Sequence, residues 1–447
     1  MRIVIAGAGE VGTHLAKMLS QEDQDITLID KSFERLNSAD SSMSVITQQG
    51  NPISFNVLEN ANVRNCELFI AVTPYETENI IACEIAKSLG AEKTVARIDN
   101  YEFMDPAKRE VFTRAGVNTV IYPEYLAAKK IQSALTHPWV RDWFEMHDGK
   151  IIVVGVKIRE NAEIVGMQLK DFAARERNFH VSAIRRRQEI IIPTGNDTIE
   201  DGDVVYFTTM AEYIEELREL CGKKLHNIRN IMIVGACRIA IRLLKLLEND
   251  DRYHLKVIDP VREQCLKISE LYPGIDVVCG DYRNIDFLKD EGLLKTDAFI
   301  ALSDNAEINI LSCLAAKDKG VKKAVAQVES LQLMPLADQN NISTIINKKL
   351  LASSAIFQLL LDIDSNDSRC LALADAEVAE IEAMPNSKIT HKLVKDLSLP
   401  RGEMTLAALI RDGVGYFING FTQIMTGDRV VIFCRQGSLS KIEKLFK

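Results

Sequence analysis

Residues 1–30 read MRIVIAGAGEVGTHLAKMLSQEDQDITLID. Residues 2–6 are a β-branched apolar run, which is typical of a buried parallel strand. The segment GAGEVG at 7–12 follows directly, and apolar residues then recur at helical spacing, at Val11, Leu15, Ala16 and Leu19. A second apolar run at 26–29 ends in Asp30. The stretch therefore predicts a strand, a glycine turn, a helix and a second strand that ends in an acid.

Each part of this pattern has a mechanical role in a dinucleotide site. Gly7 allows the tight turn, Gly9 lets the backbone approach a pyrophosphate, and Gly12 lets the helix pack closely on the strand. The helix N-terminus presents free N–H groups to phosphate, and Asp30 stands where a carboxylate meets ribose hydroxyls. Because a carboxylate disfavours a 2′-phosphate, the pattern favours NAD over NADP. The alternative to a nucleotide site is a tight glycine turn that binds no ligand. The alternative to ribose binding is that Asp30 only caps the Lys31–Ser32 turn.

Composition excludes several classes of protein. The 447 residues are 47% hydrophobic and 26% charged, and the net charge of −9 argues against nucleic acid as a partner. No apolar run reaches membrane-spanning length, and Met1 leads straight into the first strand, so we expect a cytosolic protein. The nine cysteines form no C-x-x-C pair, and the seven histidines show no zinc-binding spacing, so we expect reduced thiols.

The first pattern returns later in the chain. Strands and helices alternate through residues 1–124, which predicts a doubly wound parallel sheet. Residues 231–235 then match 3–7, and 256–259 match 27–30, at a nearly constant offset. Further matches continue in the same order, with Gly280, Ala301, Asn309, Cys313 and Gly320 in place of Gly50, Ala71, Asn79, Cys83 and Gly90. The chain is therefore a tandem repeat.

A small β-rich segment follows each parallel sheet. Short strands are expected at 150–159, 181–187 and 203–209, and again at 377–382, 406–411 and 429–434. Linking helices are expected at 127–135 and 349–361, and closing helices at 213–220 and 439–446. The predicted fold is α/β, with a Rossmann-like lobe and a small β-rich α/β lobe, repeated twice, and with domains at 1–124, 138–222, 228–348 and 365–447.

This order, together with its motifs, resembles the family of bacterial Trk-system potassium uptake regulatory subunits, the TrkA family, whose chains carry two "regulator of K⁺ conductance" (RCK, or KTN) units. The resemblance covers nearly the whole chain. Its motifs are GAGEVG at 7–12, LID at 28–30, AVT at 71–73, EN at 78–79, ARI at 96–98, IYPE at 121–124, I-R at 184–185 and 410–411, and G-D at 202–203 and 427–428.

The resemblance implies a cytoplasmic ring, in most cases a homotetramer, that docks at the inner face of the cell membrane. Its partner would be a K⁺ channel subunit of the TrkH or TrkG type. Family members bind NAD(H) and also ATP or ADP, and nucleotide occupancy of the Rossmann lobes changes the ring and gates ion flow. A ligand shifts such an equilibrium only through unequal affinity for two conformations.

Motif and resemblance together give the candidate cofactor-binding residues: Gly7, Ala8, Gly9, Glu10, Val11, Gly12, Asp30, Lys31, Gly50, Asn51, Ala71, Val72, Thr73, Glu78, Asn79 and Arg97. Arg97 ends the fifth strand, where a guanidinium can bind phosphate, and the alternative is an ion pair with Asp99. The resemblance implies that Glu124 helps to hold a metal ion against the nucleotide phosphates, and the alternative is an exposed linker carboxylate.

The second Rossmann-like lobe has lost much of this pattern. Cys237 and Ala240 replace Gly9 and Gly12, Gln327 replaces Arg97, and Lys348 replaces Glu124, whereas Asp259 keeps the ribose carboxylate. We therefore expect one tight nucleotide site per chain, in the first lobe.

Two other functions compete with a nucleotide-sensing regulatory subunit. An NAD-dependent oxidoreductase would need a catalytic acid, base or nucleophile, and the small lobes offer no such constellation. The chain would then be an enzyme, which we do not expect. The second alternative is a regulatory module of another cation transporter.

Overall fold

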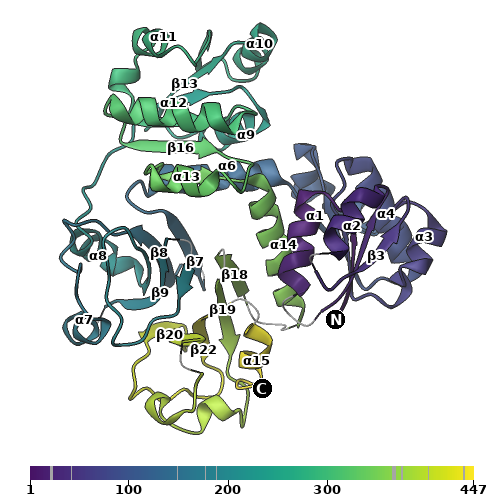
Figure 1. Ribbon diagram of the computed structural model, residues 1–447, viewed down its shortest axis with the longest axis vertical. Helices are drawn as coiled ribbons and strands as arrows, with labels where there is room; N and C mark the ends of the chain where they lie inside the picture. Colours follow the sequence, from purple (N-terminus) through teal and green to yellow (C-terminus); the bar gives the residue numbers. More distant parts are fainter. Residues whose placement is uncertain are drawn as a thin grey trace. The chain divides into compact units, whose positions relative to one another are not determined.

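The computed structural model describes residues 1–447 except 21–23, 42, 148, 177, 188, 365–368, 374–375, 401 and 436–437. It contains two six-stranded parallel sheets and two five-stranded antiparallel sheets (Figure 1). The predicted α/β fold, a repeated Rossmann-like lobe and small β-rich lobe, is confirmed. The expected start of the last lobe, residue 365, lies outside the described residues, and the lobe boundaries stay a prediction.

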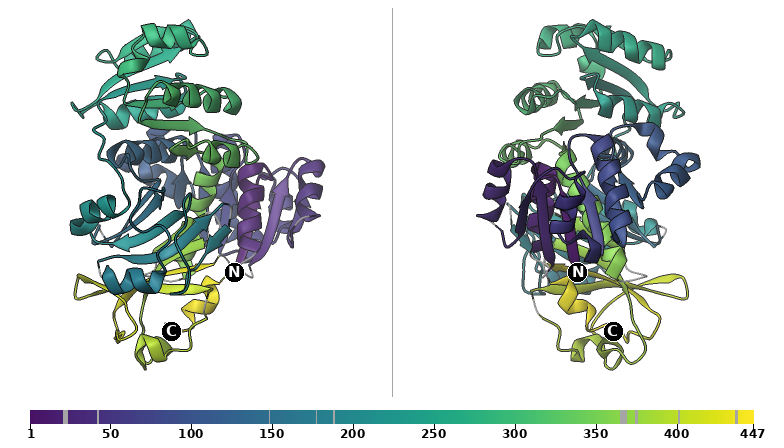
Figure 2. Two further views of the ribbon diagram at one scale, coloured as in Figure 1. Left: turned by 60° about the vertical axis from the view of Figure 1, so that its left-hand side comes forward. Right: turned by 90° about the vertical axis from the view of Figure 1, so that its right-hand side faces the viewer.

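The first parallel sheet has the strand order β3-β2-β1-β4-β5-β6. Its strands are β1 (Arg2–Ala6), β2 (Asp25–Asp30), β3 (Ile46–Gln49), β4 (Leu68–Ala71), β5 (Lys93–Arg97) and β6 (Thr119–Ile121). Helices α1 (Glu10–Ser20), α2 (Phe33–Asp40), α3 (Phe55–Asn60), α4 (Glu76–Leu89) and α5 (Arg109–Arg114) flank it (Figure 2). Ile3, Val4 and Ile5 are fully buried, which explains the continuous apolar run in the central strand.

The second parallel sheet repeats this order as β14-β13-β12-β15-β16-β17. Its strands are β12 (Asn230–Val234), β13 (His254–Asp259), β14 (Asp276–Cys279), β15 (Ala298–Ala301), β16 (Lys323–Gln327) and β17 (Thr344–Ile346). Its helices are α9 (Arg238–Leu247), α10 (Arg262–Leu271), α11 (Ile285–Asp290), α12 (Ala306–Asp318) and α13 (Met334–Gln339). In both sheets the order turns back beside the central strand, where open α/β sheets bind ligands.

Each small lobe contains an antiparallel sheet, in the order β10-β9-β11-β8-β7 or β18-β19-β22-β20-β21. The first comprises β7 (Asp142–Met146), β8 (Ile151–Lys157), β9 (His180–Arg186), β10 (Glu189–Ile191) and β11 (Val204–Thr209), with α7 (Leu169–Arg175) and α8 (Ile214–Leu220). The second comprises β18 (Arg369–Leu373), β19 (Ala376–Glu382), β20 (Met404–Arg411), β21 (Val414–Phe417) and β22 (Arg429–Arg435), with α15 (Leu439–Glu443). The sequence prediction missed the four edge strands, β7, β10, β18 and β21, because segments of three to five residues are too short to show a clear period.

A bidentate ion pair closes the turn region of each small lobe. Arg186 donates through Nε (3.0 Å) and Nη2 (2.9 Å) to Asp203, and Arg411 donates through Nε (2.8 Å) and Nη2 (2.6 Å) to Asp428. The structural counterpart of Arg411 is therefore Arg186, and the sequence comparison, which paired Arg185 with Arg411, was wrong by one residue. The reason is that the periodicity of three consecutive arginines does not fix which of them faces the aspartate.

The linking helices exchange partners between the two halves. The chain forms one compact unit of residues 1–123 with 349–447, and a second of residues 124–348. In the second unit, helix α6 (Pro123–Thr136) contacts α9 through Gln132 Nε2, which donates to the Leu246 carbonyl (3.2 Å). In the first unit, α14 (Lys348–Asp364) contacts α1, since Ser353 Oγ lies 3.4 Å from the Val11 carbonyl. Each Rossmann-like lobe thus shares a unit with the small lobe of the other half.

The three glycines of the first turn differ in how closely neighbouring atoms approach them. Gly7 has φ +112°, and a Cβ there would lie 3.0 Å from the Thr73 nitrogen. A Cβ on Gly12 would lie only 1.8 Å from the Gly7 carbonyl oxygen. A Cβ on Gly9 would meet nothing within 4 Å. Gly7 and Gly12 are therefore required by the fold, whereas Gly9 borders open space.

Lys323 is a buried cation in strand β16. Its Nζ donates to the carbonyls of Pro138 (3.3 Å) and Val140 (3.2 Å), in the segment that leads into β7. Burial, followed by repulsion from Arg141, lowers the pKa of Lys323 to about 7, and Asp142 opposes this shift. The second unit therefore buries an amine that ionises near neutral pH.

We predict that Gly12→Ala destabilises the first lobe by about 1–3 kcal/mol, because the added methyl group must displace the Gly7 carbonyl. Gly9→Ala is the matched control, and it should leave stability within about 0.5 kcal/mol of the parent. Thermal unfolding followed by circular dichroism compares the two variants. Equal melting temperatures for both would contradict the packing described above.

We predict that stability rises between about pH 7 and about pH 10, by up to about 1.4 kcal/mol per pH unit from Lys323. The folded amine loses its proton near pH 7, whereas the unfolded amine keeps it up to about pH 10.4, so raising the pH over this window removes the cost of burying charge. Lys323→Met should flatten this part of the stability profile, and the exposed-site control Lys295→Met should not. An unchanged profile in Lys323→Met would show that another group is responsible.

Candidate functional site

The carboxylate at the end of β2 organises the glycine turn of the first lobe. Asp30 Oδ2 accepts the Ala8 N–H (2.7 Å), and Oδ1 accepts the Ser32 N–H (2.8 Å). The turn-capping role considered as an alternative is therefore real. Each oxygen has two lone-pair directions, so both can still accept a hydroxyl proton. The geometry is compatible with capping and ribose binding at once.

Asn79 joins the ends of two neighbouring strands at the same edge of the sheet. Its Oδ1 accepts the Thr73 N–H (2.9 Å), and its Nδ2 donates to the carbonyls of Thr73 (3.0 Å) and Arg97 (2.9 Å). The side chain is fully buried. Asn79 therefore fixes the positions of Thr73 and Arg97, and its own polar atoms are occupied within the protein.

Arg97 lies at the carboxyl end of β5. Its Nη2 is 3.3 Å from Asp99 Oδ1, so the ion pair considered as the alternative is present. Its Nε is buried and has no hydrogen-bond partner among the described residues. The guanidinium therefore keeps a donor for a further acceptor.

The remaining candidates of the first lobe fall into three groups. Glu10 and Lys31 form ion pairs, with Lys349 and Glu78 respectively. Gly50 and Asn51 shape the turn after β3, since Gly50 N–H donates to the Asp30 carbonyl (2.9 Å) and Asn51 Oδ1 accepts the Ile53 N–H (3.2 Å). Backbone or apolar positions at the strand ends and the start of α1 are buried: Ala8, Val11, Ala71 and Val72.

Sequence reasoning did not predict the contribution of Lys349. This residue lies at the start of α14, which follows the second Rossmann-like lobe along the chain. Its side chain nevertheless pairs with Glu10 of the first glycine turn. No local pattern around Lys349 indicates this contact. Only the exchange of linking helices creates it.

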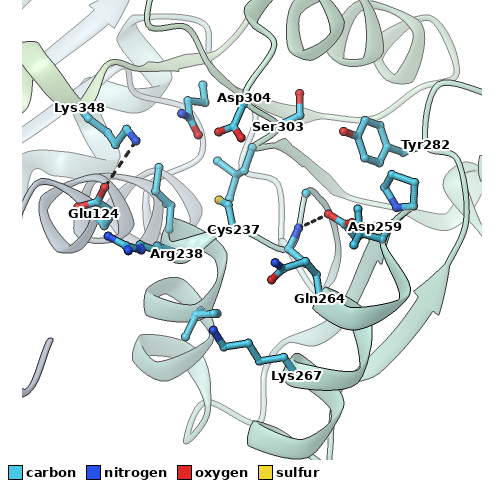
Figure 3. A pocket seen from close by; sticks show the side chains of 18 residues that line it. Glu124, Cys237, Arg238, Asp259, Gln264, Lys267, Tyr282, Ser303, Asp304 and Lys348 are labelled. Carbon is cyan, nitrogen blue, oxygen red and sulfur yellow. Dashed lines mark hydrogen bonds and ion pairs between the residues drawn. The ribbon is translucent and has the colours of Figure 1, made fainter. Parts of the chain in front are cut away.

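Glu124 lines the second lobe's pocket, and the expectation that it helps to hold a metal ion against the nucleotide phosphates stays a prediction. It follows Pro123 in α6, which packs on the second lobe. Its Oε1 is 3.5 Å from Lys348 Nζ, and its Oε2 is buried without a hydrogen-bond partner among the described residues. Figure 3 shows Glu124, Arg238 and Lys348 at one end of this pocket and Asp259 and Tyr282 at the other.

This pocket of about 610 Å³ lies at the carboxyl edge of the second parallel sheet. Asp259 repeats the geometry of Asp30, accepting the Ala236 N–H (2.7 Å) and the Val261 N–H (2.8 Å). Asn309 likewise donates to the carbonyls of Ser303 (2.8 Å) and Gln327 (2.9 Å). The second lobe thus keeps the framework of the first.

The chemistry at the framework's centre differs between the lobes. Cys237 precedes α9 where the first lobe has Gly9, and burial raises the pKa of its thiol. The charged groups that line the pocket balance, with three acids against three bases: Glu124, Asp259, Asp304, Arg238, Lys267 and Lys348. Ala240 is fully buried in α9. The pocket therefore offers a thiol and no excess of positive charge where the first lobe offers an open glycine.

Two further features of the described part of the chain concern ligands and membranes. No group of three or more His, Cys, Asp or Glu side chains there is arranged to hold a metal ion. None of the helices described is both long enough and apolar enough to span a bilayer.

Known domain families match nearly the whole chain. The TrkA-N domain matches residues 3–123 and 231–348, and the TrkA-C domain matches residues 153–222 and 378–447. The matches coincide with the two parallel sheets and the two small lobes described above.

Curated proteins resemble the chain from end to end. A Trk system potassium uptake protein TrkA of Vibrio alginolyticus is 30% identical over 459 residues, covering 100% of this chain and 99% of the relative. A TrkA homolog of Methanosarcina mazei is 29% identical over 456 residues and covers 100% of both chains. The matched regions include both halves of the repeat.

Solved structures share the fold. The GsuK RCK domain superposes with a TM-score of 0.61 at 15% identity, covering 100% of this chain and 94% of that one. The GsuK channel bound to NAD gives a TM-score of 0.61 at 14% identity, with 100% and 78% coverage. At this identity the likeness concerns the fold alone. The family matches and the full-length identity of 30% show that the chain belongs to the TrkA family of Trk system potassium uptake proteins.

Proposed function

We propose that this chain is a nucleotide-sensing regulatory subunit of a Trk-type potassium uptake system. It binds NAD(H), or ATP or ADP, in its first Rossmann-like lobe, and it gates a membrane K⁺ channel subunit of the TrkH or TrkG type. The observation that carries the proposal is the glycine turn of the first lobe, where open space at Gly9 adjoins a carboxylate-braced loop. Membership of the TrkA family and a fold neighbour solved with NAD support it.

The first lobe's residues fit an adenine dinucleotide. A Cβ on Gly9 would meet nothing within 4 Å, so a pyrophosphate can approach the backbone there, beside the N-terminus of α1. Asp30 would accept the ribose hydroxyls with its remaining lone pairs. The partnerless Nε of Arg97 would donate to a phosphate oxygen. Together these groups would bind the nucleotide and fix its orientation.

We propose that a nucleotide acts on the ring through α14. The glycine turn contacts this helix twice, through the Glu10–Lys349 ion pair and through Val11 and Ser353. Because α14 leads into the last small lobe, a ligand that repositions the turn changes the contacts of a helix that connects two lobes. Such a ligand changes the ring only to the extent that its affinity differs between the two arrangements.

The second lobe is proposed to hold no equivalent site. A cysteine side chain occupies the position of Gly9, Gln327 occupies that of Arg97, and the lining charges balance. A pyrophosphate would meet the Cys237 side chain there, and no guanidinium stands at the position of Arg97. We therefore expect one tight site per chain in a cytoplasmic homotetramer at the inner face of the membrane.

The alternatives differ in their consequences. An oxidoreductase would transfer hydride between NADH and a substrate, whereas a module of another cation transporter would bind the same nucleotide but copurify with a different membrane protein. Copurification of the tagged chain from detergent-solubilised membranes distinguishes the last case.

We predict that Asp30→Ala weakens NADH binding at least tenfold, which corresponds to about 1.4 kcal/mol. Asp259→Ala is the matched control, because Asp259 makes the same two backbone hydrogen bonds in the second lobe. Both variants lose a turn brace, but only the first loses ribose acceptors at the proposed site. Calorimetry should give one NADH per chain in the parent and in Asp259→Ala. Two equivalent sites, or equal losses in both variants, would refute the single-site proposal.

We predict that the purified protein does not turn over NADH, because neither small lobe supplies an acid–base or nucleophile constellation. Absorbance at the NADH band, followed with a panel of small carbonyl compounds, should stay constant. A protein-dependent loss of absorbance that Asp30→Ala abolishes would favour the oxidoreductase alternative.

A further inference from the structure

Two cysteines meet beside the second lobe's pocket. Cys265 lies in the first turn of α10, and its Sγ is 3.2 Å from the Asp259 carbonyl oxygen and 3.8 Å from that of Val278. Cys279 ends β14, and its Sγ is 3.7 Å from the Pro260 carbonyl oxygen. Asp259 and Cys279 are register partners of neighbouring strands. Both sulfur atoms therefore lie over the same turn, residues 259–261.

The two thiols also interact with each other. Burial and, after it, the neighbouring and hydrogen-bonding Cys279 thiol together raise the pKa of Cys265 to about 11. Of the cysteines that the structure describes, Cys279 alone is exposed, and its strand is at the edge of the sheet. One thiol of the pair is thus open to solvent, and the other is held directly behind it.

The turn beneath the thiols builds the pocket. It carries Asp259, whose carboxylate braces the Ala236 and Val261 N–H groups, and it continues into Gln264, which lines the pocket. The thiols donate to the carbonyls of Asp259 and Pro260. Oxidation of the two sulfur atoms would therefore change the hydrogen bonds of this turn and, with them, the Asp259 end of the pocket.

We infer that Cys265 and Cys279 are a modification site, at which a hydroperoxide forms a reversible disulfide that ties α10 to the end of β14 and alters the adjoining pocket. The Cys279 thiolate attacks a peroxide oxygen, the O–O bond breaks, and the leaving hydroxide becomes water on protonation. The Cys265 sulfur then attacks the resulting sulfenic sulfur, the S–S bond forms, the S–O bond breaks, and the thiol proton leaves with hydroxide as a second water. The thiol pair loses two electrons, and the peroxide gains them.

The disulfide removes both S–H donors from the turn. The carbonyls of Asp259 and Pro260 lose these hydrogen bonds, although the Asp259 carbonyl keeps the Gly280 N–H (3.0 Å). At the same time a covalent link replaces a packing contact between α10 and β14. The oxidised lobe should therefore have a more rigid start of α10 and a changed end of the pocket at Asp259.

The test treats the purified full-length protein with hydrogen peroxide, blocks free thiols with N-ethylmaleimide in denaturant, and maps tryptic peptides by mass spectrometry. We expect residues 263–267 linked to residues 268–283, at a mass two hydrogen atoms below the sum of the reduced peptides, and the link should disappear with dithiothreitol. Hydrogen exchange in residues 262–271 should be slower in the oxidised protein and should recover after reduction.

Variants separate this pair from other cysteine chemistry. Cys279→Ser should leave Cys265 fully alkylated after peroxide, and Cys265→Ser should leave Cys279 as an over-oxidised acid. Cys237→Ser, which removes another thiol that lines the pocket, is the control that should keep the link. The inference is overturned if Cys279 instead joins Cys237 or a second chain on a non-reducing gel, if both thiols stay reduced in peroxide, or if exchange in α10 is unchanged by the link.

Discussion

In both parallel sheets an aspartate at the end of the second strand braces the glycine turn that follows the first strand. One oxygen accepts an N–H from the turn, and the other accepts an N–H from the residues beyond the strand, in Asp30 and in Asp259 alike. Charge-assisted hydrogen bonds of this kind are stronger than neutral ones. The turn can therefore keep the positive φ of Gly7 or Gly235 and hold the next helix against the strand. The position of each pocket follows from this bracing.

The two lobes show that one framework supports different chemistry. The brace, the buried asparagine and the strand order are shared, so the second lobe folds as the first does. The side chains that face a ligand are not shared, because the fold does not depend on them. Gly9 borders open space, and a cysteine can replace it at the equivalent position without loss of the turn. The side chains at the ligand-facing positions of the second lobe can consequently differ from those of the first without loss of the fold.

The exchange of linking helices connects these sites to the rest of the chain. Glu124 lines the second pocket although it follows the first sheet, and Lys349 reaches the first glycine turn although it follows the second. Buried charges accompany such contacts, as at Lys323, where backbone carbonyls of another lobe receive the ammonium group. Burying the charged form of this amine is costly, and this cost lowers the pKa of Lys323.

The sequence by itself determined the repeat, both parallel sheets, the glycine turns and the two aspartates, because these depend on local periodicity and on residues with special backbone requirements. It offered the ion pair of Arg97 with Asp99 only as the alternative to phosphate binding, since the two residues are neighbours on the chain. It could not predict the edge strands β7, β10, β18 and β21, which are too short to show a clear period, nor which of three adjacent arginines meets Asp203. It did not predict that Glu124 lines the second lobe's pocket. Only the tertiary structure decided the partners of the linking helices and the meeting of Cys265 with Cys279, because contacts between residues far apart in sequence depend on how whole elements pack and leave no periodic trace in the chain.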